Sequence, residues 1–114
     1  MAKFPSIIIG KREDHDKDFG NKGCAIHFLK IESKYFYEVR SGRKKAEFRR
    51  NDRDFRKGDA VVLMEIQKKK ETGNFLIAEI DHVLFDFDHK DLPIGFAMLS
   101  LRVVYPDQHT RAFR

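Results

Sequence analysis

The stretch Ser41–Asp59, with the sequence SGRKKAEFRRNDRDFRKGD, lies within the most positively charged part of this chain. Between Lys34 and Lys57, ten lysines and arginines stand against four acidic residues, a local excess of +6. The whole chain of 114 residues has a net charge of +5, so the remainder is nearly balanced. Charge concentrated in this way is typical of a surface that contacts phosphate. A solvated, salt-bridged hairpin is the alternative, but the interleaved Phe48 and Phe55 favour a binding surface.

The same stretch contains the spacing Gly42-x-Lys44-x-x-Glu47-x-Arg49. This pattern resembles the G-x-K-x-x-E-x-R signature of ASCH domains, a branch of the PUA-like superfamily of small RNA-binding β-barrels. The resemblance implies a PUA-like barrel in which these residues line a cleft between the barrel and a helix.

The sequence around this signature is similar to one subfamily more closely. The similarity includes the continuation Arg49–Asp59 and the preceding segment His27–Ile31, which reads H-F-L-K-I. That subfamily comprises small bacterial and phage domains of uncharacterised function. The resemblance extends from Ile26 to the C-terminal strand, and it implies a fold without implying a settled activity.

Length and composition restrict the class of protein. The chain is long enough for one domain with a single core, to which eleven phenylalanines contribute. With 36% charged residues and a pI near 9.4, anionic partners are expected. The single cysteine, Cys24, excludes an internal disulfide and fits a reducing compartment, and a structural thiol is a simpler interpretation than a nucleophile. No segment approaches the ~20 apolar residues of a membrane span, so we expect a cytoplasmic protein with no membrane partner.

Three parts are expected: an N-terminal extension over residues 1–25, a barrel domain over residues 26–106 and a tail over residues 107–114. Within the extension, Phe4–Ile9 is predicted to be a short edge strand, because its three isoleucines favour extended backbone. Lys11–Lys22 alternates charges and is predicted to be an exposed loop. Its Asp14-His15-Asp16 motif lacks further ligands at a metal-binding spacing, so we expect neither a metal nor a cofactor.

The barrel domain is expected to be mainly β (α+β), with five or six strands and one principal short helix. The expected elements are a strand over Ile26–Glu32, a helix over Ser33–Ser41, and strands over Lys45–Arg50, Asp59–Gln67, Phe75–Phe85 and Phe96–Tyr105. A hairpin tip is predicted over Lys68–Asn74, which contains Thr72-Gly73-Asn74, and a polar loop over Asp86–Gly95. Short connections between most strands predict a small barrel that closes its own edges.

The expected helix has recognisable ends. Ser33 is suited to the N-cap, and Gly42 is suited to the C′ position that terminates a helix. Tyr35, Phe36 and Val39 are spaced to form one buried stripe.

Alternation assigns faces to two of the strands. His27 shares a face with Leu29 and Ile31, where a hydrogen-bonded core histidine is the usual role and a site role is the alternative that the resemblance offers. In Lys45–Arg50, Ala46 and Phe48 are expected on one face, with Lys45, Glu47 and Arg49 on the other. Lys44 must then lie in the turn after Gly42 in order to reach the same site as Glu47.

A nucleic-acid or nucleotide site is expected to draw on basic, acidic and amide side chains of this region. These candidates are His27, Lys30, Lys44, Glu47, Arg49, Arg50, Asn51 and Arg53. A carboxylate among cations holds them in fixed orientations and accepts hydrogen bonds from an unstacked base, while arginine contacts phosphate. Arg49 and Arg50 are expected to be exposed cations.

The two aromatic residues of the basic stretch are each compatible with two roles, core packing and stacking on a base. Phe48 and Phe55 are most simply core residues, and stacking on a base is the alternative.

Catalysis is a competing hypothesis. Some ASCH proteins hydrolyse the amide of N4-acetylcytidine with a lysine of this motif, a nearby threonine and a distant glutamate. Lys44 is present here, but Glu47 occupies the position that aligns with the threonine, so only Lys44 and Glu47 remain as catalytic candidates. A general-base mechanism through Glu47, with Lys44 as oxyanion partner, would be required. A protein–protein interaction module is the third alternative, and the sequence leaves the oligomeric state open.

Overall fold

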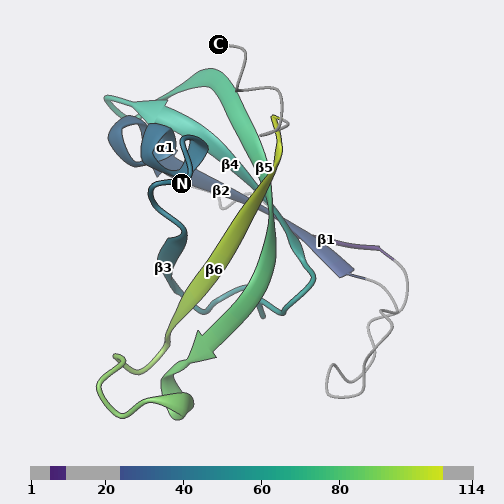
Figure 1. The fold of residues 1–114 in the computed structure, drawn as a ribbon, viewed down its shortest axis with the longest axis vertical. Helices are drawn as coiled ribbons and strands as arrows, with labels where there is room; N and C mark the ends of the chain where they lie inside the picture. Colours follow the sequence, from purple (N-terminus) through teal and green to yellow (C-terminus); the bar gives the residue numbers. More distant parts are fainter. Residues whose placement is uncertain (1–5, 10–23, 107–114) are drawn as a thin grey trace.

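The computed structural model describes residues 6–9 and 24–106, which form a twisted sheet with one helix (Figure 1). The elements are β1 (Ser6–Ile9), β2 (Cys24–Glu32), α1 (Ser33–Arg40), β3 (Ala46–Arg50), β4 (Ala60–Gln67), β5 (Lys70–Phe85), a single 3-10 turn η1 (Asp86–Asp88) and β6 (Phe96–Tyr105). Helix α1 and the β4–β5 hairpin lie at one end of the molecule, and η1 lies at the other. The prediction of a mainly β domain with one principal helix is confirmed.

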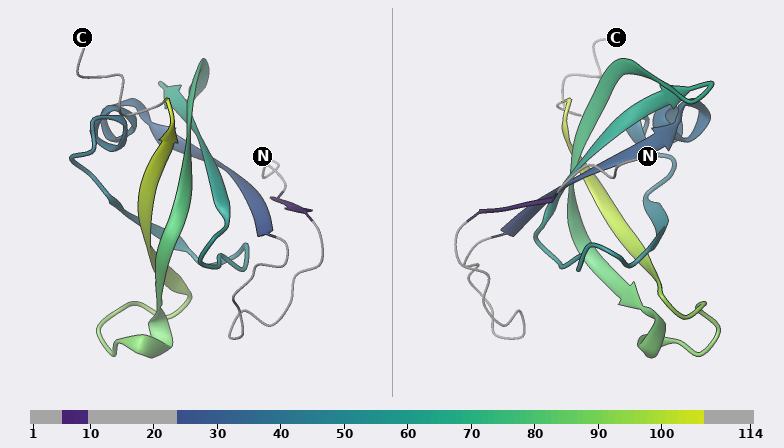
Figure 2. Two further views of the ribbon diagram at one scale, coloured as in Figure 1. Left: turned by 45° about the vertical axis from the view of Figure 1, so that its right-hand side comes forward. Right: turned by 180° about the vertical axis from the view of Figure 1, so that it is seen from behind.

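The six strands form one mixed sheet in the order β1-β2-β4-β5-β6-β3. Strands β2 and β4 are parallel because α1 and β3 intervene between them in the sequence, whereas every other pair is antiparallel. The sheet curves strongly (Figure 2). Among the described residues its backbone ladder nevertheless runs open from β1 to β3, and the predicted closure of the barrel by strand pairing is not seen.

The core lies on the concave side of the sheet and beneath α1. Inward residues alternate with outward ones along β2 and β4, as a half-buried strand requires. His27, Leu29 and Ile31 share the buried face as predicted. Helix α1 contributes Phe36 and Val39 to the core. Tyr35, which was expected in the same stripe, is instead exposed.

Helix α1 ends as its sequence predicts, and its start differs slightly. Gly42 adopts a left-handed φ of 86° and its N–H donates to the Val39 carbonyl, which terminates the helix. The N-cap residue is Glu32, with no side-chain cap, and Ser33 is the first helical residue. The Ser33 hydroxyl is directed to another partner, Glu65.

The β4–β5 connection corrects the predicted hairpin tip. The turn consists of Lys68 and Lys69 alone, both with positive φ, and β5 already begins at Lys70. Thr72-Gly73-Asn74 therefore lies within β5, where the pairing register with β4 shifts between Met64 and Ile66. The physical reason is that two lysines adopt left-handed φ angles that the sequence pattern assigned to glycine.

The faces of β3 alternate as predicted, but the buried face is the charged one. Glu47 is buried, whereas Phe48 is 45% exposed. The expectation that Phe48 belongs to the core is therefore wrong. Phe55 is completely buried, as expected.

The remaining predictions on the sheet ends have mixed outcomes. An N-terminal edge strand is confirmed as β1, which pairs with β2, and the last strand ends before Pro106 as predicted. The predicted loop Lys11–Lys22, its Asp14-His15-Asp16 motif and the tail over residues 107–114 lie outside the described residues. Within the described part, no helix has the length and apolar character that crossing a membrane requires.

Candidate nucleic-acid interface

Three residues of the basic stretch form a compact charged cluster at β3. The Lys44 Nζ lies 2.8 Å from Glu47 Oε1, and the Arg49 Nε lies 2.8 Å from Glu47 Oε2. Lys44 also donates to the Ala46 carbonyl at 2.5 Å. Lys44 reaches Glu47 from the turn that follows Gly42, the position that strand alternation required. The carboxylate thus engages one cation through each oxygen.

Arginines from β3 and the following segment bridge the gap to β2. Arg49 Nη2 donates to the Lys30 carbonyl at 2.6 Å, and Arg53 Nη1 donates to the Phe28 carbonyl at 2.9 Å. Among the residues that the structure describes, β1 pairs with β2 as far as His27, and these two carbonyls lie beyond that described ladder. Guanidinium groups therefore form a side-chain seam between β2 and β3.

This seam changes the role expected of Arg49. Its side chain is 24% exposed and is held by both Glu47 and a backbone carbonyl. The prediction that Arg49 is a simple exposed cation is wrong, because its guanidinium satisfies groups of the fold. Lys30 contributes its backbone carbonyl to the seam, and its side chain is partly exposed.

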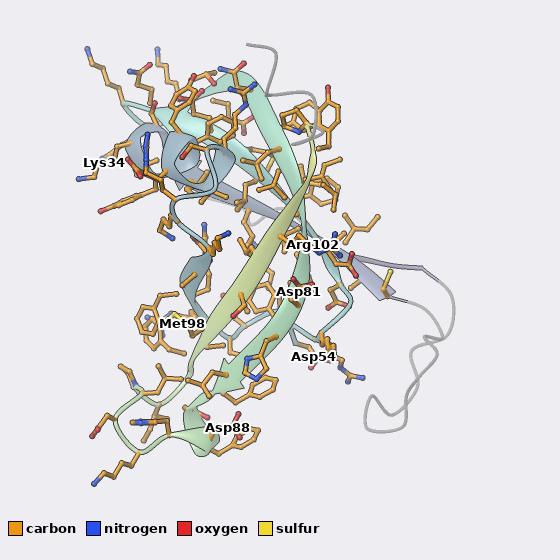
Figure 3. All side chains as sticks on the ribbon, viewed as in Figure 1. Lys34, Asp54, Asp81, Asp88, Met98 and Arg102 are labelled. Carbon is orange, nitrogen blue, oxygen red and sulfur yellow. The ribbon has the colours of Figure 1, made fainter. Side chains whose placement is uncertain are left out.

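The opposite face of β3 carries an aromatic–arginine row, defined as Phe48, Phe96 and Arg50. The rings of Phe48 and Phe96 stack with centroids 5.0 Å apart and planes 14° apart. The Arg50 guanidinium lies 4.8 Å from the centre of the Phe96 ring. Pairing of β3 with β6 sets this arrangement, because Arg50 lies opposite Phe96 and Phe48 lies opposite Met98. Met98 is labelled in Figure 3, beside β3.

Asn51 follows the row at the end of β3. Its backbone N–H donates to the Gly95 carbonyl at 2.7 Å, which anchors the β5–β6 connection. Its side-chain Oδ1 is buried and accepts no hydrogen bond from any residue that the structure describes.

The structure places His27 in the core rather than beside the charged cluster. Its ring Nε2 lies 2.8 Å from Asp59 Oδ2, and both residues are almost completely buried. Asp59 also accepts hydrogen bonds from the backbone N–H groups of Ala25 and Arg56. The imidazole meets the edge of the Phe55 ring. These contacts give His27 the role of a hydrogen-bonded core histidine.

A buried carboxylate that sequence reasoning missed lies at the end of the molecule occupied by α1. Glu65 is 3% exposed and accepts hydrogen bonds from Ser33, Thr72 and Asn74, at 2.5, 2.6 and 2.9 Å. These hydroxyl and amide donors, above all the Ser33 hydroxyl, hold the pKa of Glu65 below its ordinary value although burial opposes them. The sequence feature that could have indicated this buried carboxylate is the position of Glu65 on the inward face of an otherwise apolar strand.

The described part of the chain adds neither a metal site nor a new catalytic candidate to those expected from the sequence. Within the described ranges, no group of three His, Cys, Asp or Glu side chains is placed to hold a metal ion. Asp86 and Asp88 cap backbone N–H groups of Gly95 and Phe85, which is turn chemistry. Cys24 is a partly buried free thiol.

The fold and the site together define a small mainly β domain with a basic edge strand. The chain belongs to the family described as "Domain of unknown function (DUF3850)", whose model matches residues 26–101. A relative described as an uncharacterized 12.9 kDa protein in the GpA 3′ region of Escherichia phage P2 is 41% identical over 58 residues. The matched segment covers 51% of this chain and 53% of the phage protein, about half the length of each.

Proposed function

We propose that this domain binds single-stranded RNA, or nucleotides derived from it, along strand β3. The observation that carries the proposal is the Phe48–Phe96–Arg50 row. An exposed aromatic ring beside a guanidinium offers an unpaired base a stacking surface and offers its phosphate a cation. Phe48 is half exposed rather than core, and its ring is presented on the outward face of β3, stacked on Phe96.

The charge distribution supports the same partner. Six lysines and arginines between residues 34 and 57 are exposed, namely Lys34, Arg40, Arg43, Lys45, Arg50 and Lys57. The exposed acids of this window are Glu38, Asp52 and Asp54. The excess of exposed positive charge favours a polyanion and makes its binding sensitive to salt.

The charged cluster of Lys44, Glu47 and Arg49 supports the row from the other face of β3. Because Glu47 fixes Arg49, and Arg49 binds β2, the edge strand is held rigidly while its outward side chains contact the ligand. Lys44, whose side chain is 29% exposed, is the member of the cluster that we propose contacts phosphate.

We further propose that the domain is PUA-like and related to ASCH domains. In support of this affiliation, Lys44 and Arg49 of the G-x-K-x-x-E-x-R pattern both bind Glu47. In this proposal the arginine seam between β2 and β3 takes the place of the last ladder of a closed barrel.

The proposal is tested by fluorescence anisotropy with a short labelled oligouridylate at low salt. We expect Arg50→Glu and Lys45→Glu each to weaken binding severalfold or more, because each removes a positive charge and adds a negative one near the phosphates. Lys70→Glu, an equally simple reversal at an exposed position outside the window, is the matched control. Absence of binding by the unaltered protein at low salt would contradict the proposal, as would equal effects of all three reversals.

A further inference from the structure

A second aromatic surface lies at the opposite end of β6 from the Phe48–Phe96–Arg50 row. A cleft of about 360 Å³ opens between α1, the start of β5 and the end of β6. Strand β6 runs from Phe96 to Tyr105, so about 30 Å of extended strand separates the row from this cleft. The cleft is therefore a separate site.

Three half-exposed aromatic side chains line this cleft. Tyr37, Phe75 and Tyr105 are 48%, 45% and 52% exposed. Phe75 and Tyr105 stack with centroids 5.7 Å apart and planes 21° apart. Flat rings that remain half exposed around one hollow favour a planar ligand that stacks on them.

The buried Glu65 network fixes a polar group in the wall of the cleft. Asn74 lines the cleft, and its Nδ2 donates to Glu65 Oε1 at 2.9 Å. Because a carboxylate only accepts hydrogen bonds, the amide nitrogen must face Glu65. Among the described residues no donor reaches Asn74 Oδ1, so it is the atom of this amide that can accept a hydrogen bond from a ligand. An acceptor in fixed orientation selects a ligand that presents an N–H donor.

The cleft also contains a cation. Arg40, an exposed residue in the last turn of α1, lines it together with the aromatic residues. A guanidinium pairs with a phosphate through parallel hydrogen bonds. The cleft therefore suits a ligand with a planar ring, an N–H donor and an anionic group. A nucleotide whose base carries an amino group has all three.

We propose that this cleft binds a mononucleotide whose base carries an exocyclic amino group, as cytosine and adenine do. The base stacks on Phe75 and Tyr105, its amino group donates to Asn74, and its phosphate pairs with Arg40. The side chains of Thr72 and Ser33 serve indirectly, because they complete the hydrogen bonds of Glu65, which orients Asn74.

Calorimetric titration of the full chain with CMP, AMP, UMP and choline tests the proposal. We expect CMP and AMP to bind severalfold more tightly than UMP, because UMP has no exocyclic amino group and, in the same pose, would place its O4 acceptor against the Asn74 oxygen. Phe75→Ala should weaken CMP binding about tenfold, the order expected for one stacked base. Phe87→Ala is the matched control, because Phe87 is also exposed and belongs to a stacked pair outside both proposed sites, and it should leave CMP binding unchanged.

Arg40 gives a second test, because its side chain is exposed on α1 and replacing it should not disturb the folding of the sheet. Arg40→Gln should reduce the affinity for CMP to about that for cytidine. The proposal is overturned if choline binds and the nucleotides do not, if CMP and cytidine bind the unaltered protein equally, or if Phe87→Ala weakens CMP binding as much as Phe75→Ala does. Oligouridylate binding without CMP binding would reject this cleft while leaving the proposal for β3 intact.

Discussion

The guanidinium of Arg49 donates a hydrogen bond to the backbone carbonyl of Lys30, with 2.6 Å between Nη2 and the oxygen. The two residues belong to strands that do not pair with each other through their backbones. The same guanidinium binds Glu47, which in turn binds Lys44. The most basic part of the sequence therefore has two physical roles: the inward charges join β3 to β2, and the outward charges face solvent.

The inward role predicts a loss of stability when Arg49 is replaced. We expect Arg49→Ala to lower the free energy of unfolding by about 2 kcal/mol, because hydrogen bonds to charged groups contribute about 1.5–3 kcal/mol each. Arg49→Lys should recover only part of this loss, since an ammonium cannot reproduce the planar fork of the guanidinium. Urea unfolding measures both values. Arg50→Ala is the control on the outward face and should change stability by no more than about 0.5 kcal/mol. Equal losses for the Arg49 and Arg50 variants would contradict the seam.

A second prediction concerns the buried pair of His27 and Asp59. Asp59→Ala should lower the free energy of unfolding by about 3 kcal/mol or more, because it leaves the ring and two backbone N–H groups without their acceptor. Asp59→Asn should lose less, since one side-chain oxygen remains. Asp54→Asn, at an exposed aspartate of the preceding turn, serves as the control for thermal and urea unfolding. A folded and fully stable Asp59→Ala variant would show that the pair is not a structural element of the core.

A third prediction follows from the lowered pKa of Glu65. A carboxyl whose folded-state pKa lies below its unfolded value stabilises the fold at pH values above the unfolded value. The unfolded value is near 4.5, and this contribution is lost as the pH falls through the lower folded-state pKa. The difference in stability between the unaltered chain and Glu65→Gln should therefore be constant near neutral pH and shrink below about pH 4.5.

Urea unfolding between pH 3 and pH 7 measures the Glu65 effect. At neutral pH we expect Glu65→Gln to be less stable by about 1–3 kcal/mol, since its amide nitrogen would face one of the three donors. Glu71→Gln, at an exposed position of β5, should not show this difference. A stability difference for Glu65→Gln that grows as the pH falls would have the wrong sign.

The elements that depend on local pattern could be predicted from the sequence. The apolar run of β4 and the termination of α1 at Gly42 have local causes, and the structure agrees with both. Alternation also assigned His27 to the buried face of β2. The predicted alternation of side chains along β3 is also confirmed, but the alternation alone does not determine which of the two faces is buried. Glu47 is buried with its charge neutralised by Lys44, from the turn before the strand, and by Arg49, from the strand itself.

What could not be predicted depends on residues distant in the chain. The donors to Glu65 lie 32, 7 and 9 residues away, and they meet only once β4 and β5 are paired with a register shift. The seam likewise joins residues 19 and 25 positions apart. The turn at Lys68 and Lys69 lacked the glycine that marks such turns, so the predicted tip was displaced toward Gly73.

The central claim, that β3 binds single-stranded RNA through stacking on Phe48, is tested most directly by one comparison. The affinities of the unaltered chain, Phe48→Ala and Phe75→Ala are measured at one salt concentration, with an oligouridylate and with an abasic oligonucleotide of the same length. We predict that Phe48→Ala binds the base-bearing strand about tenfold more weakly and the abasic strand unchanged, while Phe75→Ala alters neither. If Phe48→Ala binds both strands as the unaltered chain does, or weakens both equally, Phe48 does not stack on a base and the account of β3 is wrong.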